Sequence, residues 1–409
     1  MSRDSDAFAT QPLPLSRGAA AGRWRTLAGS LTFQVLTILV VSRLFLFGAN
    51  WFTLRAFPRF GYYPAQLPDE FLPGTMWLDG WARWDTAHYV TIALHGYGGA
   101  GNLSHDGGLG FFPLFPMMMK GLVAITGLTA TEGRLAVAAI VIANVCFAVS
   151  VPLFARLVSA RFDDEIARLA TIFLCISPFS YFFSVGYSES LFLLLALLTF
   201  TFADRRWWIA AAIAVALADS SRIVGLALVP SLILLAWYSR VRWRELIAIA
   251  VISPLGTLGY FLYTWWKFDD FFGYFTAQGH WGGWNEHVRH YLTLFLLHPR
   301  ETLLGDPLNL VIVLNVILGI IWLISLPWVW KLLDPGIATF TSLLVLGQGA
   351  MTWVSLGRYL LPAIGFYVIA AWFLSKPFWR GWPREIAIVG STVMLTMLTI
   401  LFGHGYWVI

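Results

Sequence analysis

Long runs of apolar residues, separated by short polar and basic stretches, extend along the chain from Leu31 to Phe402. Several runs approach the ~20 residues that an α-helix needs to cross the hydrocarbon core of a bilayer. The strands of membrane β-barrels give weaker segments of about ten residues with alternating polarity, whereas these runs are longer and continuous. The pattern therefore predicts an all-α polytopic membrane protein.

The distribution of lysine and arginine gives each predicted span a direction, because cytoplasmic loops of membrane proteins carry an excess of these residues. Basic residues in the N-terminal segment place the start of the first span inside, and the later basic clusters fall inside in the same threading. This threading contains about eleven spans. Their predicted bounds are Ser30–Trp51, Arg134–Val158, Ile166–Phe183, Gly186–Phe202, Trp207–Ser221, Ile223–Tyr238, Glu245–Trp265, Leu308–Trp330, Gly336–Val354, Tyr359–Leu374 and Glu385–Phe402.

One further apolar run, Phe111–Leu128, is open to two interpretations. If it crosses the membrane, the later basic clusters lie on the outer side, against the usual bias. If it lies in the outer interface, all of these clusters face the cytoplasm. Lys120 within the run, and prolines at positions 113 and 116, also favour an interfacial helix. We therefore predict an interfacial helix inside a long outer loop over residues 53–133.

Composition narrows the classes of function. Hydrophobic residues make up 58% of the chain and charged residues only 12%, and the formal charge is +5. Most of the basic residues form short clusters between apolar runs, which sets orientation and does not indicate a nucleic-acid partner. The polar segment 1–29 lacks the apolar core and cleavage site of a signal peptide. We predict that it is a disordered cytoplasmic tail before a single transmembrane domain, 30–409.

The predicted threading brings ionisable and polar residues together at the outer face of the membrane. The outer loop and three outer turns contribute Arg83, Asp85, His88, Tyr187, Glu189, Arg222, Arg358 and Tyr359. Ionisable groups near membrane depth are costly to desolvate and usually mark a functional site. The sequence therefore predicts a polar site at this face.

Each charged residue of this group also has a structural interpretation. Asp85 could simply cap the short helix that follows it, because aspartate is among the commonest N-caps. Glu189 could form a structural pair with Arg222, since charges within membranes usually pair. Arg222 and Arg358 could be snorkelling anchors, although lone arginines on the outer side run against the charge bias. Arg43, inside the first span, is more consistent with holding the helix bundle together.

Five stretches, in this order, resemble the GPI mannosyltransferase 2 (PIG-V type) family. They are RWDTAHYVTIALHGYG, FFPLFP, PFSYFFSVGYSESLF, DSSRIVGLALVP and GRYLLP, and the resemblance extends from about Arg43 to Pro362. The RWD element with its downstream HGY and FFPLFP is the more specific part. The family belongs to the GT-C group of multispanning glycosyltransferases, so the resemblance implies a GT-C-like bundle of about 11 transmembrane helices.

The resemblance also implies an activity, the transfer of mannose from a polyprenyl (dolichyl-type) phosphate donor to a lipid-linked or cell-surface glycan. GT-C enzymes place an acidic residue in the first outer loop, and Asp85 matches that position. We expect Asp85 to be the general base of an inverting single displacement. Arg222 and Arg358 are expected to neutralise the departing phosphate. The further substrate contacts that we expect are Arg83, His88, Tyr187, Glu189, Tyr359 and, near the lipid head group, Lys120.

No cofactor and no metal are expected. His280, His287 and His290 share one outer loop, but the sequence gives them no metal-binding geometry, and an aromatic interfacial loop is the preferred interpretation. The expected partners are the donor, a glycan or glycolipid acceptor and membrane lipids. The expected location is the plasma membrane for a prokaryotic protein, or the ER membrane for a eukaryotic one, with the site on the extracytoplasmic side.

Two other functions stay open at the level of sequence. A GT-C enzyme that uses another sugar fits the same residues, because epimeric sugars differ only in the direction of one hydroxyl group. A transporter or flippase of lipid-linked sugars would need polar residues through the membrane midplane and paired broken helices. The charges here cluster at the outer surface instead.

Overall fold

The computed structural model describes residues 17–58, 70–98, 108–279, 293, 295–305, 307–351 and 355–408, and within these ranges its regular structure is helix. The elements are α1 (Arg17–Ala56), α2 (Met76–Asp79), α3 (Thr86–His95), η2 (Gly108–Gly110), α4 (Leu114–Ile125), α5 (Glu132–Ser159), α6 (Asp164–Ile176), η3 (Ser180–Phe183), α7 (Glu189–Asp204), α8 (Trp208–Asp219), η4 (Ile223–Ala227), α9 (Leu228–Tyr238), α10 (Trp243–Ile252), α11 (Leu255–Phe268), α12 (Gly273–Gly279), α14 (Pro299–Leu304), α15 (Pro307–Leu332), α16 (Pro335–Met351), α17 (Leu356–Tyr359), α18 (Gly365–Leu374) and α19 (Trp382–Gly403).

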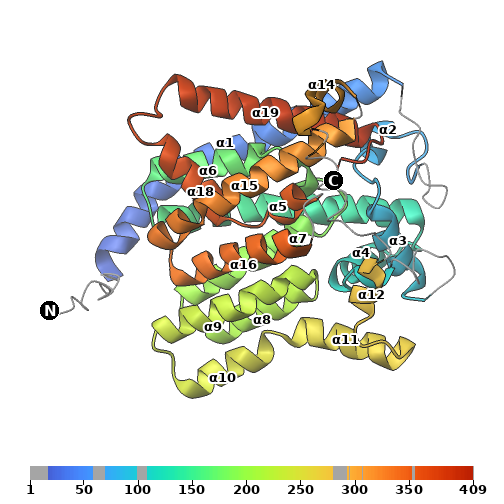
Figure 1. The fold of residues 1–409 in the computed structure, drawn as a ribbon. Helices are drawn as coiled ribbons and strands as arrows, with labels where there is room; N and C mark the ends of the chain where they lie inside the picture. The colour runs from blue at the N-terminus through green and yellow to red at the C-terminus, as the bar shows by residue number, and fades with distance from the viewer. Residues whose placement is uncertain are drawn as a thin grey trace.

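The long helices lie side by side as a bundle (Figure 1). α5 packs against α6 and α7, α7 packs against α8, and α1 lies against α6 and α19. The short elements α2, α3, α4, α12 and α14 gather at one end of this bundle, on the right of Figure 1. The connections α9–α10, α15–α16 and α18–α19 lie at the opposite end. Within the described residues of the segment predicted as an outer loop, α2, α3 and α4 thus lie at one end of the bundle.

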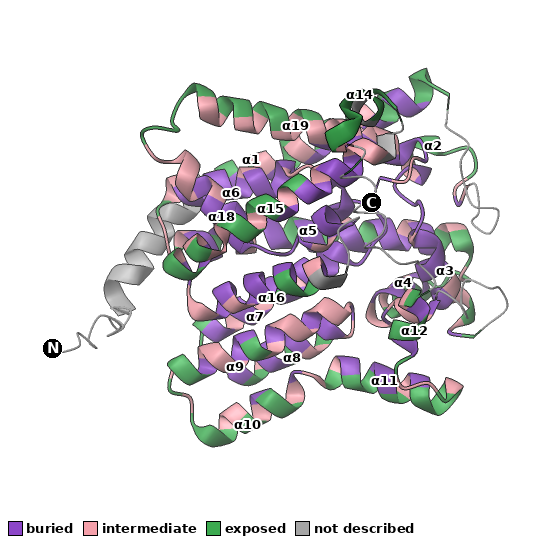
Figure 2. Cartoon of the chain, in the orientation of Figure 1, coloured by how far each residue is buried: buried purple, intermediate pink, exposed green. Residues whose placement is uncertain are grey.

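Apolar side chains cover much of the outer surface of the bundle. Exposed residues line the outer edges of α10, α11 and α19 (Figure 2), and they include Trp243, Trp266 and Val393. Among the described residues, five helical stretches are long and apolar enough to cross a membrane, namely Leu31–Ala56, Glu132–Ser159, Trp243–Phe268, Asn309–Leu332 and Trp382–Gly403. An apolar surface of this extent is stable in lipid rather than in water. The structure is therefore that of a helical membrane protein.

The predicted spans each contain a helix, but the helices differ in length. The helices in five of these spans are shorter than the five long stretches, namely α6, α7, α8, α9 and α18. The span predicted at Glu245–Trp265 is divided between α10 and α11 next to Pro254, because proline cannot donate the hydrogen bond that a continuous helix requires. The number of helices that cross the membrane stays a prediction.

The first helix begins earlier than the sequence predicts. α1 starts at Arg17, within the segment 1–29 that we expected to be a disordered tail, while residues 1–16 lie outside the described residues. The sequence RGAAAG at the start of α1 is rich in alanine, the strongest helix former. Helix can therefore extend from the apolar span back into this segment.

The apolar run Phe111–Leu128 forms α4, which has 12 residues. At ~1.5 Å per residue this helix is about 18 Å long, short of the ~30 Å hydrocarbon core. α4 packs against α3 and α5, with Phe115 and Met119 fully buried and Met117 and Lys120 exposed on the other face. Its length and its two faces favour the interfacial interpretation over a crossing helix.

Arg43 ties three elements of the bundle together, which confirms its structural interpretation. Its guanidinium donates hydrogen bonds to the carbonyl oxygens of Cys175 and Ser180 and to the hydroxyls of Ser180 and Ser184. It also lies over the ring of Phe147, 4.7 Å from the centroid. These contacts join α1 to α6 and η3, and they fix the segment that leads into α7.

Candidate active site

Asp85 lies where the chain turns into α3, at the end of the bundle that carries the short helices. The preceding residue, Trp84, has a φ of 50°, in the left-handed region that residues other than glycine rarely adopt. The indole of Trp84 donates a hydrogen bond to the carbonyl oxygen of Tyr406 at 3.3 Å. Strained backbone of this kind concentrates at functional sites. The side chain of Asp85 makes no capping hydrogen bond, so the interpretation as a helix cap is wrong.

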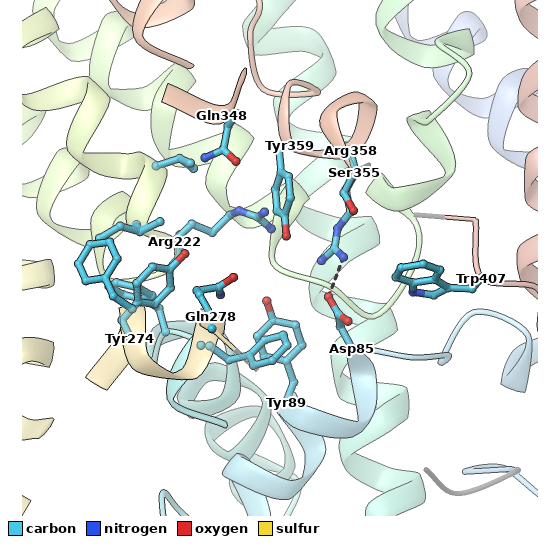
Figure 3. A pocket seen from close by; sticks show the side chains of 18 residues that line it. Asp85, Tyr89, Arg222, Tyr274, Gln278, Gln348, Ser355, Arg358, Tyr359 and Trp407 are labelled. Atoms are coloured by element: carbon cyan, nitrogen blue, oxygen red, sulfur yellow. Dashed lines mark ion pairs between the residues drawn. The ribbon is translucent and has the colours of Figure 1, made fainter. Parts of the chain in front are cut away.

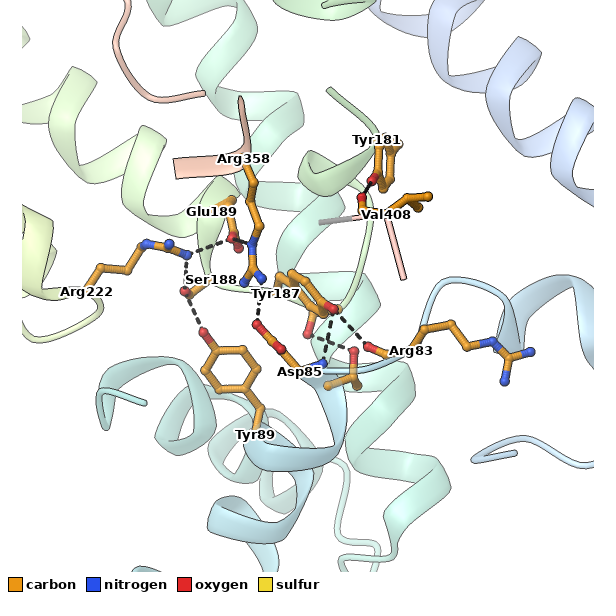
Figure 4. A network of polar contacts seen from close by, with 12 residues as sticks. Arg83, Asp85, Tyr89, Tyr181, Tyr187, Ser188, Glu189, Arg222, Arg358 and Val408 are labelled. Atoms are coloured by element: carbon orange, nitrogen blue, oxygen red, sulfur yellow. Dashed lines mark hydrogen bonds and ion pairs between the residues drawn. The ribbon is translucent and has the colours of Figure 1, made fainter. Parts of the chain in front are cut away.

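Four charged side chains from separate segments form one network around Asp85 (Figure 4). Oδ2 of Asp85 is 2.6 Å from Nη1 of Arg358. Nε of Arg358 also contacts Oε1 of Glu189, and Nη1 of Arg222 is 2.7 Å from the same oxygen. The interpretation of Glu189 as a structural partner of Arg222 is therefore confirmed, and Arg358 shares that partner. Two carboxylates face two guanidiniums, so the network is neutral as a whole.

Burial makes this network energetically significant. The side chain of Glu189 is 0% exposed, that of Arg358 is 4% exposed and that of Arg222 is 11% exposed. The guanidinium heads point inward to Glu189, so the interpretation of these arginines as snorkelling anchors is wrong. Removal of one partner from a buried ion pair costs about 3–5 kcal/mol, because it leaves a desolvated charge uncompensated.

Tyr187 contacts both Asp85 and Arg358. Its hydroxyl accepts a hydrogen bond from the backbone N–H of Asp85 at 3.1 Å and donates one to the carbonyl oxygen of Arg83 at 3.1 Å. The guanidinium of Arg358 lies over its ring, 4.4 Å from the centroid. Tyr187 is fully buried between these groups, so it fixes the position of the acid and of the arginine together.

Tyr89, one turn along α3 from Asp85, extends the network to the second arginine. Its hydroxyl is 2.8 Å from the hydroxyl of Ser188, which accepts a hydrogen bond from Arg222 at 3.3 Å. Burial, reinforced by the charge of Glu189, raises the pKa of Tyr89. The phenol therefore stays protonated at neutral pH and acts as a hydrogen-bonding group rather than an anion.

The two arginines are held firmly in their charged form. Burial alone would lower the pKa of Arg358, but the carboxylates of Asp85 and Glu189 more than offset it and raise that pKa well above its usual value. Burial also acts to lower the pKa of Arg222, and Glu189 reverses the effect, so the net shift is upward. Both side chains therefore present permanent positive charge to anything that binds beside them.

A cavity of about 360 Å³ joins the acid to both arginines (Figure 3). Its wall is contributed by α3, η2, η4, α12, α16, α17 and the chain after α19. Asp85, Tyr89, Arg222, Tyr274, Gln278, Gln348, Ser355, Arg358, Tyr359 and Trp407 are among the lining residues. The volume is in the range of small-molecule sites, ~300–1,000 Å³. In one cavity, a carboxylate can accept a proton while guanidinium groups bind an anion.

The structure brings some of the predicted site residues to the cavity and leaves others outside its wall. Asp85, Arg222, Arg358 and Tyr359 line it, whereas Tyr187 and Glu189 lie behind that wall. The remaining predicted contacts lie elsewhere.

Arg83, His88 and Lys120 have other surroundings. The guanidinium of Arg83 points away from the network, to a buried ion pair with Asp79 at 2.8 Å (Figure 4). The ring of His88 stacks on Phe111, with the centroids 4.5 Å apart. Lys120 is exposed on α4. The loop that holds His280, His287 and His290 lies outside the described residues.

Several lining residues were missed by the sequence analysis. Tyr89 lies inside the quoted RWDTAHYVTIALHGYG stretch, four residues after Asp85, so helical spacing already gave a signal for it. Gln278, Gln348 and Trp407 are isolated polar or aromatic residues in segments of no distinctive pattern. Their place at the cavity follows only from the packing of α12, α16 and the C-terminal residues.

The fold and the site define a helical membrane protein with a cavity lined by an acid and two arginines at one end of its bundle. Residues 64–241 match the model of the family described as mannosyltransferase (PIG-V). The resemblance inferred from the motifs is thereby confirmed for this part of the chain, which includes Asp85, Glu189 and Arg222. Arg358 lies beyond the matched segment.

The chain is also similar to curated mannosyltransferases. The chain is 32% identical over 151 residues to GPI alpha-1,6-mannosyltransferase 2 of Mus musculus, and 30% identical over 151 residues to that of Homo sapiens. Each alignment covers 34% of this chain and 27% of the relative, so the matched region spans about a quarter of the length of these proteins.

Similarity to solved structures extends over more of the chain but is weaker. The apo form of the oligosaccharyltransferase of Archaeoglobus fulgidus superposes with a TM-score of 0.47 and 13% identity, over 91% of this chain and 56% of that one. The archaeal oligosaccharyltransferase from the same organism, in complex with an inhibitory peptide and a dolichol-phosphate, gives a TM-score of 0.43 and 12% identity over 92% and 56%.

Proposed function

We propose that the protein is a mannosyltransferase that moves mannose from a polyprenyl phosphate donor to a lipid-linked or cell-surface glycan. The observation that carries this function is a cavity in which a carboxylate, Asp85, lies beside the two guanidiniums of Arg222 and Arg358. The match of residues 64–241 to the mannosyltransferase (PIG-V) family supports the sugar and the reaction class.

The proposed reaction is a single displacement at the anomeric carbon of the donor. The acceptor hydroxyl oxygen attacks that carbon while the bond to the phosphate oxygen breaks, and the proton of the hydroxyl passes to the carboxylate of Asp85. The bonding electrons leave with polyprenyl phosphate, and the configuration at the carbon inverts. A hydroxyl group has a high pKa, so it needs a base at hydrogen-bond distance in the transition state.

The arginines would receive the negative charge that develops on the departing phosphate. Guanidinium groups match phosphate oxygens with two parallel hydrogen bonds. Arg358 forms an ion pair with Asp85, so a bound phosphate would compete with Asp85 for this arginine. Donor binding would therefore release the carboxylate to act as a base. Glu189, which contacts both arginines from behind, would keep them at a fixed spacing.

The other predicted residues take supporting roles in this proposal. Tyr187 and the backbone of Arg83 would position Asp85, as their hydrogen bonds to the turn suggest. Tyr359, which lines the cavity, would contact the sugar or the acceptor. His88 would support the wall through its stack on Phe111. Lys120, exposed on the interfacial helix α4, would meet a lipid head group outside the cavity.

We further propose a GT-C-like domain over residues 30–409, with about eleven transmembrane helices and an outer loop over 53–133. The distribution of charge supports the orientation. The α9–α10, α15–α16 and α18–α19 connections lie at the end of the bundle opposite the site (Figure 1). Arg240 and Arg380 lie in the first and the last of these connections, and Lys331 lies in the last turn of α15. Basic residues face the cytoplasm in membrane proteins, which would place the cavity on the extracytoplasmic side of the plasma or ER membrane.

The decisive experiment incubates the purified protein with radiolabelled polyprenyl-phosphate mannose and a membrane lipid extract. We expect label to pass to a glycolipid or glycan, with unlabelled polyprenyl phosphate as the second product. Parallel reactions with the glucosyl and galactosyl donors identify the sugar. Flux of intact donor across vesicles reconstituted with the protein, with no transfer of label, would overturn the enzyme and favour a flippase.

A further inference from the structure

Two carboxamides line the part of the cavity next to Arg222, and the proposed displacement uses neither of them. Gln348, on α16, is only 7% exposed, and Gln278, on α12, is half-buried. Within the part of the chain that the structure describes, neither amide has a hydrogen-bond partner. An unpaired amide in a buried position costs free energy, and buried polar groups are almost always hydrogen-bonded. These side chains are therefore available for a polar ligand.

We propose that Gln348 and Gln278 form a subsite that recognises hydroxyl groups of the donor hexose. Figure 3 shows both amides directed into the space beside Arg222, although the two glutamines are 70 positions apart in the sequence. Each carboxamide offers two N–H donors and one oxygen acceptor, and each sugar hydroxyl is both donor and acceptor. Two such groups at one wall can fix the orientation of a pyranose ring. This assignment rests on the proposed function.

The position of the amides points to the donor sugar rather than to the acceptor. The donor hexose is covalently joined to its phosphate, so groups that read it must lie next to the arginines that bind the phosphate. Gln348 and Gln278 lie on the Arg222 side of the cavity (Figure 3). Trp407 lies on the other side, next to Asp85, where the acceptor hydroxyl must approach the base. The two sides of the cavity thus divide between donor and acceptor.

Gly110, which has no side chain, leaves space for the amide of Gln278. A Cβ atom at Gly110, on η2, would lie 3.1 Å from Nε2 of Gln278, tighter than ordinary van der Waals contact. A side chain at this position would therefore require the amide to shift by a few tenths of an ångström. This close approach is a second feature, independent of Gln348, that sets the geometry of the same wall.

The test measures equilibrium binding of polyprenyl-phosphate mannose and of sugar-free polyprenyl phosphate to the full-length protein in the same detergent. The ratio of the two dissociation constants gives the contribution of the sugar. Gln348→Leu keeps a similar size but removes the hydrogen-bonding groups, and we expect it to reduce this ratio about tenfold. Binding of sugar-free polyprenyl phosphate should stay at the wild-type value, because a merely structural effect would weaken both ligands.

Two further variants keep the test decisive. Gln278→Leu changes a half-buried side chain, so it should fold even if Gln348→Leu does not, and we expect the same loss of preference for the sugar. Gln34→Leu, on the exposed face of α1, makes the same chemical change outside the cavity and should leave the ratio unchanged. A wild-type ratio in folded Gln348→Leu and Gln278→Leu proteins would overturn the subsite.

The outcomes also separate the subsite from the proposed function. A wild-type protein that prefers the mannosylated lipid, and loses this preference in the glutamine variants, supports the subsite even if no mannose is transferred. In that case only the proposed function fails. A protein that transfers mannose normally, with an unaltered ratio in both variants, keeps the function and overturns the subsite.

Discussion

Replacing Asp85 by asparagine removes one charge from the network with little change of shape, and its effect on catalysis should be large. In the proposed reaction Asp85 accepts the proton of the attacking hydroxyl, a role that contributes about 10²–10⁴ in rate. We therefore expect kcat to fall by this factor. Arg358 and Arg222 still share Glu189 as a buried partner, and the side chain of Asp85 is 15% exposed at the cavity, so the protein should still fold.

The same substitution should strengthen donor binding. Asp85 lies 2.6 Å from Arg358 and competes with the donor phosphate for that guanidinium. Without the carboxylate, the network changes from neutral to a charge of one positive unit. Two unit charges 4 Å apart interact by about 4 kcal/mol at an effective dielectric constant of 20. If about a third of this energy is realised, the KM for the donor falls about tenfold.

The assay is steady-state transfer from radiolabelled donor, with kcat and the donor KM determined separately. Asp204→Asn is the matched control, because Asp204 forms a partly exposed ion pair with Arg161 outside the cavity. Its kinetics should equal those of the wild type. A folded Asp85→Asn protein with kcat near the wild-type value would refute the base role. A low kcat together with a raised donor KM would refute the competition for Arg358.

Three further substitutions test the surroundings of the acid. Glu189→Ala removes the carboxylate shared by both buried arginines and should lower the free energy of unfolding by about 3–5 kcal/mol, measured by thermal unfolding in detergent; an unchanged midpoint would contradict this. Arg222→Ala should raise the donor KM about ten- to hundredfold, the worth of a charge-assisted hydrogen bond, and a change confined to the acceptor KM would argue against a phosphate role. Gly357→Ala would press a Cβ against the ring of Phe179 and displace α17, which should reduce transfer. Gly347→Ala is the control, because a Cβ there meets open space, and it should behave as wild type. Equal activities of the two variants would show that the ring of Phe179 moves aside without displacing α17.

The sequence pattern was sufficient for the class of fold and for part of the site. Apolar runs and basic clusters are local features, and the free energy of placing them in lipid or in water depends little on which neighbours they meet. A desolvated charge is costly wherever it occurs, so Asp85, Arg222 and Arg358 could be selected without a structure. The structure places all three at one cavity.

Only the tertiary structure decided which of these groups face the cavity and which lie behind it. The sequence analysis predicted Glu189 and Tyr187 as substrate contacts. In the structure they lie behind the cavity wall instead, where Glu189 contacts Arg358 and Tyr187 accepts a hydrogen bond from the backbone of Asp85. Gln278 and Gln348 had no signal in the sequence, and they reach the cavity because α12 and α16 meet there. Hydrogen bonds are short and directional, so partners more than 100 positions apart are set by how helices cross. By itself the sequence determined that charge would be buried at one face; the packing of the bundle determined what that charge can touch.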